Sequence, residues 1–125
     1  MNRFTTIKSI VMQYLPIFVL LVAIYMLANG VLHDFFVLMQ YKEAYDRNLL
    51  RLLMDGHILI TSSVMYIIAF FLLRQDNTIG LYLCLATSAS LLIYCGMIFP
   101  FLKSYLTIGL NVLVFAGAAI KLLWK

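Results

Sequence analysis

The side chains best suited to acid–base chemistry gather in one part of this sequence. Asp55 and His57 stand directly before the uncharged, mostly apolar run ILITSSVMYIIAFFLL, and His33 lies inside an earlier apolar stretch. Ionisable groups within apolar segments of this kind mark a functional site by default. Histidine suits proton transfer because small changes of environment move its pKa across neutral pH. We therefore predict Asp55, His57 and His33 as an acid–base set.

Polar side chains flank this set at helical spacing, in two stretches that a short loop would bring together. Positions 47, 51 and 55 are spaced i, i+4 and i+8, which places them on one side of a helix. Asn29 likewise lies four residues before His33. The two stretches together predict a polar pocket at one end of the helices. We predict that this pocket binds a ligand, and that Tyr94 and Asn111 from later in the chain contribute to it. The predicted ligand-binding residues are Asn29, Asp34, Arg47, Arg51, Tyr94 and Asn111.

Other chemistries are disfavoured by the residues they require. A metal site needs three or four converging ligands, whereas the chain has two histidines and no HExxH motif, so we predict no metal site. Asp55 and His57 point about 200° apart around one helix. A hydrolase needs a nucleophile beside a histidine, and no GxSxG-like turn is present. The sequence identifies no cofactor.

Each candidate residue also has a structural interpretation. Arg51 and Asp55, four residues apart, can neutralise each other on one helix. Long basic side chains at helix ends can extend to the membrane surface at little cost, and His33 can be an interfacial histidine with satisfied hydrogen bonds. The sequence leaves structural and functional roles open for His33, Asp34, Asp55 and His57.

The composition indicates the environment of these side chains, which is a membrane. Of the 125 residues, 65% are hydrophobic and 11% are charged, whereas a soluble domain has roughly 45–50% apolar and about 25% charged residues. A chain of this size cannot bury so much apolar surface in a soluble core. The net charge of +4 is dispersed along the sequence, so we expect no nucleic-acid partner. Soluble enzymes, nucleic-acid modules and disordered tails are excluded.

Four apolar segments are long enough to cross a bilayer, which takes about 20 residues of helix. We predict helices at approximately 10–39, 47–73, 79–99 and 105–124, with the first ending either near Gly30 or near Gln40. The connections YKEAYD, RQDNT and PFLKS are short, so helices adjacent in sequence should be antiparallel. The predicted fold is therefore an all-α integral membrane protein, an antiparallel four-transmembrane-helix bundle forming a single domain over residues 1–125.

The flanking charges favour one orientation in the membrane. Five of the nine basic residues fall on the side that carries both termini, and basic residues are enriched on the cytoplasmic side. We expect a multi-pass protein with both termini in the cytoplasm and an uncleaved first helix. Its expected partners are the lipid bilayer and either a membrane-protein partner or further copies of itself.

Three functions are compatible with this sequence. The first is a binding or accessory subunit of a membrane complex, since no complete catalytic set can be assembled. The second is a small membrane enzyme acting on a quinone or lipid by acid–base chemistry, with Arg51 holding an anion. The third is a homodimeric small transporter. The length and helix number resemble those of the small multidrug-resistance transporters, but the run LPIFVLLVAIYMLA lacks that family's glutamate, so the resemblance is one of size only.

Overall fold

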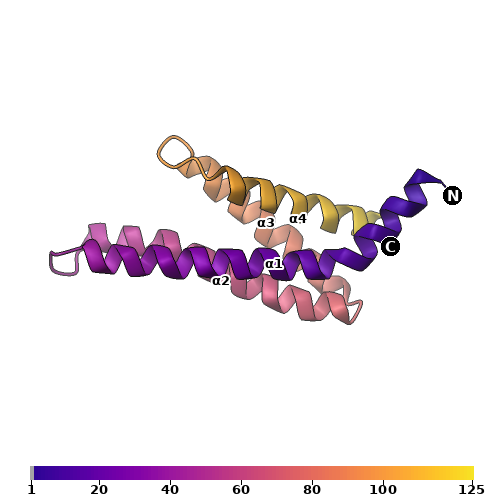
Figure 1. Ribbon diagram of the computed structural model, residues 1–125, viewed down its shortest axis with the longest axis horizontal. Coiled ribbons are helices and arrows are strands. Elements are labelled where there is room, and N and C mark those ends of the chain that lie inside the picture. The colour runs from indigo at the N-terminus through magenta and orange to yellow at the C-terminus, as the bar shows by residue number, and fades with distance from the viewer. Residues whose placement is uncertain (1) are drawn as a thin grey trace.

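The chain forms four α-helices, shown in Figure 1. The computed structural model describes residues 2–125, and its helices are α1 (Arg3–Gln40), α2 (Arg47–Arg74), α3 (Thr78–Ile98) and α4 (Tyr105–Leu123). Residues 2–125 contain no strand. Each helix is long and apolar enough to cross a membrane. The prediction of an all-helical chain with four candidate spans is therefore confirmed, and the chain is consistent with a multi-pass membrane protein.

Helix α1 is longer than predicted at its start and takes the longer of the two predicted ends. It begins at Arg3, because the polar segment RFTTIK contains no residue that breaks a helix, and the Thr5 hydroxyl donates to the Asn2 carbonyl oxygen at 2.6 Å. It continues past Gly30 to Gln40. Pro16 lies inside it, and Figure 1 shows a bend near its N-terminal end. Proline removes one helical hydrogen bond and kinks the helix there.

Side-chain caps fix the starts of the two middle helices. The Asp46 carboxylate accepts a hydrogen bond from the Leu49 amide at 2.8 Å, at the start of α2. The Asn77 side chain accepts one from the Ile79 amide at 3.0 Å, at the start of α3. Such caps satisfy amides that have no partner within the helix. They set where the helices begin after short loops.

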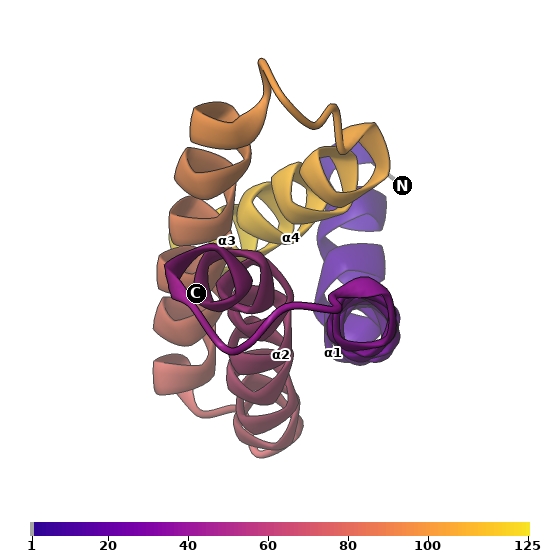
Figure 2. The same cartoon turned by 90° about the vertical axis from the view of Figure 1, so that its left-hand side faces the viewer.

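Four pairs of helices make the most extensive contacts, and these pairs close a ring. The packed pairs are α1 with α2, α2 with α3, α3 with α4, and α1 with α4, and Figure 2 shows α4 lying between α3 and α1. The loop between α1 and α2 and the loop between α3 and α4 lie at the same end of the molecule (Figure 1). Both termini and the turn between α2 and α3 lie toward the opposite end. The two loops thus bring the ends of four helices together.

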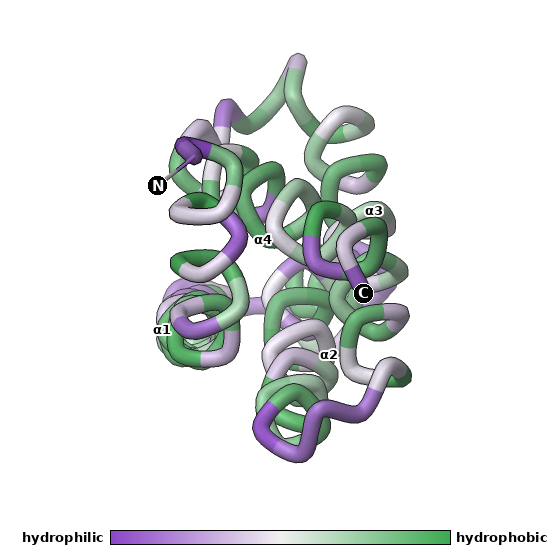
Figure 3. Tube along the Cα trace, turned by 90° about the vertical axis from the view of Figure 1, so that its right-hand side faces the viewer, coloured by the Kyte–Doolittle hydropathy of each residue, from purple (hydrophilic) through white to green (hydrophobic). Residues whose placement is uncertain are grey.

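The core draws apolar side chains, from alanine to tyrosine, from all four helices. Its fully buried members include Val19, Val22, Ala23, Met26, Tyr66, Ala69, Cys84, Leu91, Val114 and Ala118. The outer surface is also apolar, with Leu21 and Leu113 each 58% exposed. Figure 3 shows hydrophobic colour along the helices and hydrophilic colour at the N-terminus and at the turn between α2 and α3. An apolar exterior of this extent is typical of a surface that contacts lipid.

Candidate functional site

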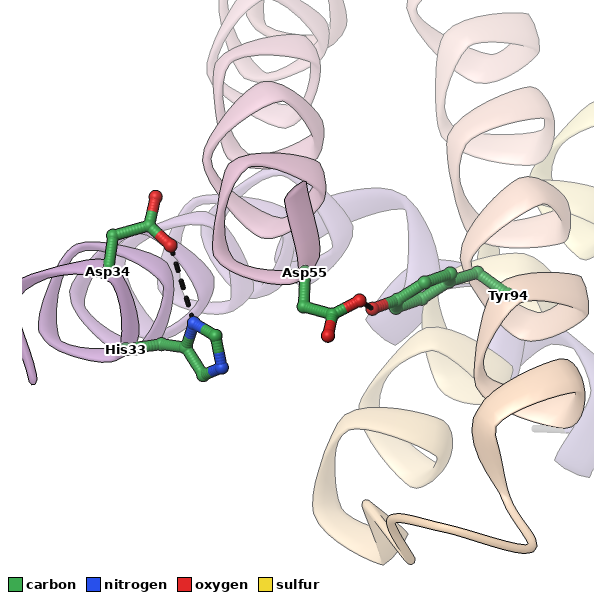
Figure 4. A network of polar contacts seen from close by, with 4 residues as sticks. All are labelled: His33, Asp34, Asp55 and Tyr94. Atoms are coloured by element: carbon green, nitrogen blue, oxygen red, sulfur yellow. Dashed lines mark hydrogen bonds and ion pairs between the residues drawn. The ribbon is translucent and has the colours of Figure 1, made fainter. Parts of the chain in front are cut away.

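A hydrogen bond between two helices forms the centre of the candidate site. The Tyr94 hydroxyl of α3 donates to the Asp55 carboxylate of α2 at 2.6 Å (Figure 4). Both side chains are half-buried. A hydrogen bond to a carboxylate is charge-assisted and is about twice as strong as a neutral one. The structure thus brings together two of the residues that the sequence analysis singled out.

These two side chains line a cavity of about 80 Å³ to which every helix contributes. Helix α1 provides Asn29 and His33, and α4 provides Thr107. Apolar side chains and the loop between α3 and α4 complete the wall. The full lining is Asn29, His33, Asp55, Leu59, Tyr94, Cys95, Ile98, Leu102, Ser104 and Thr107. Four of the predicted site residues therefore share one cavity.

His33 faces this cavity with one ring nitrogen already engaged. Its Nδ1 lies 3.3 Å from the Asp34 carboxylate, and the side chains of His33 and Asp34 are 33% and 21% exposed. Figure 4 shows the imidazole pointing from α1 toward the side where the Asp55 carboxylate lies. The contact with Asp34 orients the ring and leaves Nε2 for another partner.

Asp34 itself lies at the crossing of α1 and α2 and does not line the cavity. Its carboxylate packs against Gly56, where an added Cβ would overlap it, and the same Cβ would lie 2.8 Å from the Gly30 carbonyl oxygen. Glycine at both positions lets the two backbones approach closely. In the structure Asp34 therefore positions a helix crossing and the His33 ring.

Three predicted residues point elsewhere. Arg47, Arg51 and His57 are exposed and do not line the cavity. His57 follows Asp55 by two residues, so the helical rotation of about 200° turns it away. In residues 2–125 no ion pair joins Arg51 to Asp55, so the neutralising pair considered from the sequence does not form. Asp55 accepts a hydrogen bond from Tyr94 instead.

Asn111 lies in the core, below the cavity along α4. It is fully buried and accepts a hydrogen bond from the Tyr66 hydroxyl. Its amide nitrogen donates to the Thr107 carbonyl oxygen at 2.8 Å and contacts the Met26 sulfur at 4.0 Å. These contacts satisfy the amide and tie three helices together, so the structure gives Asn111 a packing role.

Sequence reasoning missed the hydroxyl groups that complete the cavity. Thr107 is buried, lines the cavity and lies 3.3 Å from the Tyr25 hydroxyl of α1. Ser104 lines the cavity at the start of α4, without a side-chain cap bond of its own. The available signal was helical spacing, because Thr107 precedes Asn111 by one turn.

The loop that joins the helices carrying His33 and Asp55 is fixed by a second carboxylate. The Tyr41 hydroxyl donates to Asp46 at 2.6 Å, which raises the pKa of Tyr41 to about 12. The same hydrogen bond, together with the bond from the Leu49 amide, holds the pKa of Asp46 below its usual range. The loop and the first turn of α2 are thus held by one acidic side chain.

No group of three or more His, Cys, Asp or Glu side chains converges within residues 2–125. Cys84 and Cys95 are both free and buried. Comparison of the chain with protein-family models, curated proteins and solved structures finds no match. The case for function therefore depends on the cavity itself.

Proposed function

We propose that this chain is an integral membrane protein whose four helices form an antiparallel bundle with both termini in the cytoplasm. The four apolar helices, the apolar exterior and the placement of both longer loops at one end (Figure 1) support this arrangement. In it, the candidate cavity lies toward the end of the bundle that faces away from the cytoplasm.

We further propose that the protein binds a small polar group in this cavity. The observation that carries the proposal is the Asp55 carboxylate, which is bonded to Tyr94 and faces a cavity lined from four helices. Whole drug-sized ligands occupy pockets of roughly 300–1,000 Å³. A cavity of about 80 Å³ accommodates only a small group, and any remainder of the ligand lies outside it.

Binding is better supported than acid–base catalysis. Of the predicted acid–base set, Asp55 and His33 line the cavity while His57 is exposed on the outside of α2. Arg51, the residue expected to hold an anionic substrate, is also exposed and outside the lining. A quinone or lipid enzyme would therefore depend on Asp55 and His33 alone. Roles as an accessory subunit or a homodimeric transporter stay predictions, because both depend on a second chain.

Native mass spectrometry of the protein released from mild detergent tests the binding function. Ser104→Phe places a phenyl ring at a lining position without removing a cap bond. His57→Phe is the matched control, since His57 is exposed and does not line the cavity. We expect wild type and His57→Phe to retain a small-molecule adduct that Ser104→Phe loses. A wild-type protein without any adduct, or an adduct retained equally by Ser104→Phe, would contradict the proposal.

A further inference from the structure

The polar side chains that line the cavity include one acidic group and several neutral groups that can accept hydrogen bonds. Asp55 supplies a carboxylate, and Asn29, Ser104 and Thr107 supply an amide and two hydroxyl groups that can accept hydrogen bonds as well as donate them. No lysine or arginine belongs to the described lining. The one basic ring, His33, already has its Nδ1 against Asp34. The cavity is therefore suited to a group that brings donors and positive charge.

The Asp55 carboxylate is incompletely partnered by the protein. A carboxylate offers about four acceptor sites, and the Tyr94 hydroxyl uses one of them. Figure 4 shows the second carboxylate oxygen directed away from Tyr94. Within the described chain no cationic side chain pairs with Asp55. Because a charge in apolar surroundings is costly unless it is paired, a cation beside this oxygen would stabilise the site.

The walls of the cavity restrict what that cation can be. Leu59, Ile98 and Leu102 are apolar side chains that line the same space, so a fully hydrated inorganic ion would lose water without replacement on that side. A primary ammonium group differs, because its three N–H donors can meet the acceptor oxygens while its carbon substituent contacts the leucine and isoleucine side chains. The volume of about 80 Å³ suits one such group.

We propose that the cavity binds a protonated primary amine, R–NH3⁺, with the ammonium against Asp55 and the substituent leaving through the partly open side. This inference rests on the proposed binding function and names the chemical class of its ligand. The amine can belong to a free small molecule or to an ethanolamine phospholipid. Both sources present the same ammonium, and the experiment below separates them.

Thermal unfolding of the full chain in detergent, followed with a thiol-reactive fluorophore, measures binding directly. The dye reports unfolding because Cys84 and Cys95 are free and buried in the folded protein. Methylammonium is the probe, and tetramethylammonium at equal ionic strength is the comparison, because it carries the charge without N–H donors. We expect methylammonium to raise Tm in a concentration-dependent manner and tetramethylammonium to leave it unchanged.

Variants assign the effect to the carboxylate. Asp55→Asn should weaken the apparent affinity for methylammonium by about tenfold or more, because hydrogen bonds to a charged group are stronger than those to a neutral group. Asp76→Asn is the matched control, because Asp76 is exposed in the turn at the other end of the molecule. Equal shifts with both cations, or a shift that survives Asp55→Asn, would overturn the assignment of an amine to this cavity.

Mixed micelles show whether the amine comes from a lipid or from a free small molecule. Together with native mass spectrometry, they also separate failure of the amine assignment from failure of the binding function. Stabilisation by phosphatidylethanolamine over phosphatidylcholine supports a lipid headgroup, whereas stabilisation by methylammonium alone supports a free amine. A non-amine adduct in native mass spectrometry would overturn the amine class and leave the binding function intact. No adduct and no shift with either amine source would overturn both.

Discussion

At the scale of single residues, the polar side chains inside the bundle are of two kinds. Some have hydrogen-bond partners for all their polar atoms, and others have acceptor sites without a partner. Asn111 is fully buried and has partners on its oxygen and its nitrogen, and such groups fix packing because leaving one unpaired is costly. Asp55 is half-buried, and Tyr94 is its one hydrogen-bond partner in the described chain. The first group stabilises the bundle, and the second is available to a ligand.

The Tyr66–Asn111 pair gives a stability prediction. Tyr66→Phe leaves the buried Asn111 oxygen without its donor, which should lower the free energy of unfolding by about 1–3 kcal/mol. Adding Asn111→Leu to this variant removes the unpaired amide, so the double variant should lose less than the sum of the two single losses. Tyr82→Phe, at a residue 57% exposed, is the control. Denaturant unfolding in detergent measures the wild type, the two single variants, the double variant and the control, and strictly additive losses would contradict the pairing.

The candidate site was only partly predictable from these residues. Asp55, His33, Asn29 and Tyr94 meet because short loops return each helix to the same end, and loop length is visible in sequence. The sequence does not show which residue of a polar stretch faces inward, because only two positions separate the lining residue Asp55 from the exposed His57. The sequence also does not show how far along a helix the cavity extends. Asn111 lies in the core and not at the cavity.

At the scale of elements, the crossing of α1 and α2 sets the position of the residues that line the cavity on both helices. Gly30 lies one turn before His33 and Asp34, and Gly56 directly follows Asp55. A Cβ at Gly30 would lie 2.7 Å from the Gly56 carbonyl oxygen, so backbone faces backbone here. Because backbone atoms cannot rotate aside as a side chain can, the crossing has little tolerance for added volume.

Gly56→Ala should therefore destabilise the protein although alanine favours helix. The new methyl group meets the Asp34 carboxylate and the Gly30 carbonyl oxygen, and overpacking of this kind costs typically 1–3 kcal/mol. Gly96→Ala is the matched control, because a Cβ there has nothing within 4 Å, and it should leave Tm unchanged or raise it. Thermal unfolding of the two variants tests this prediction. Equal Tm values would show that the close approach of the α1 and α2 backbones does not constrain the helices.

The helices themselves were the most predictable part of the molecule. Apolar runs of about 20 residues have few alternatives to a membrane-spanning helix, and the four candidate spans are confirmed. The start of α1 at Arg3 differs from the predicted start near residue 10, because the apolar run begins after the polar segment that opens the helix. A polar segment without proline or glycine can continue a helix, so hydropathy marks the apolar span and not the ends of the helix.

At the scale of the whole molecule, the arrangement predicts which loops share a side of the membrane. The α1–α2 and α3–α4 loops lie at one end and the α2–α3 turn toward the other (Figure 1). The native cysteines are buried and should react slowly with a membrane-impermeant thiol reagent. Glu43→Cys and Phe101→Cys should label from outside the cell, and Gln75→Cys only after the membrane is opened. Labelling of all three from one side would contradict the antiparallel bundle.

The helices also differ in length in a way that matters to the surrounding lipid. At 1.5 Å per residue, the 38 residues of α1 and 28 of α2 extend about 57 and 42 Å, whereas the 21 of α3 and 19 of α4 extend about 32 and 29 Å. The hydrocarbon core is about 30 Å thick. Near the end of α1, Phe35 and Phe36 are each 54% exposed and Met39 is 66% exposed, so this end of α1 presents apolar side chains, whereas the segment RFTTIK at its start is polar.

The lengths of α3 and α4 therefore match an ordinary bilayer, while α1 and α2 extend beyond it. Hydrophobic mismatch is relieved by tilting a helix or by thickening the lipid around it. Either response acts on the α1–α2 hairpin more than on α3 and α4. Since the cavity is lined from both pairs of helices, we expect the length of the lipid acyl chains to change its width, which would couple what it binds to the thickness of the membrane.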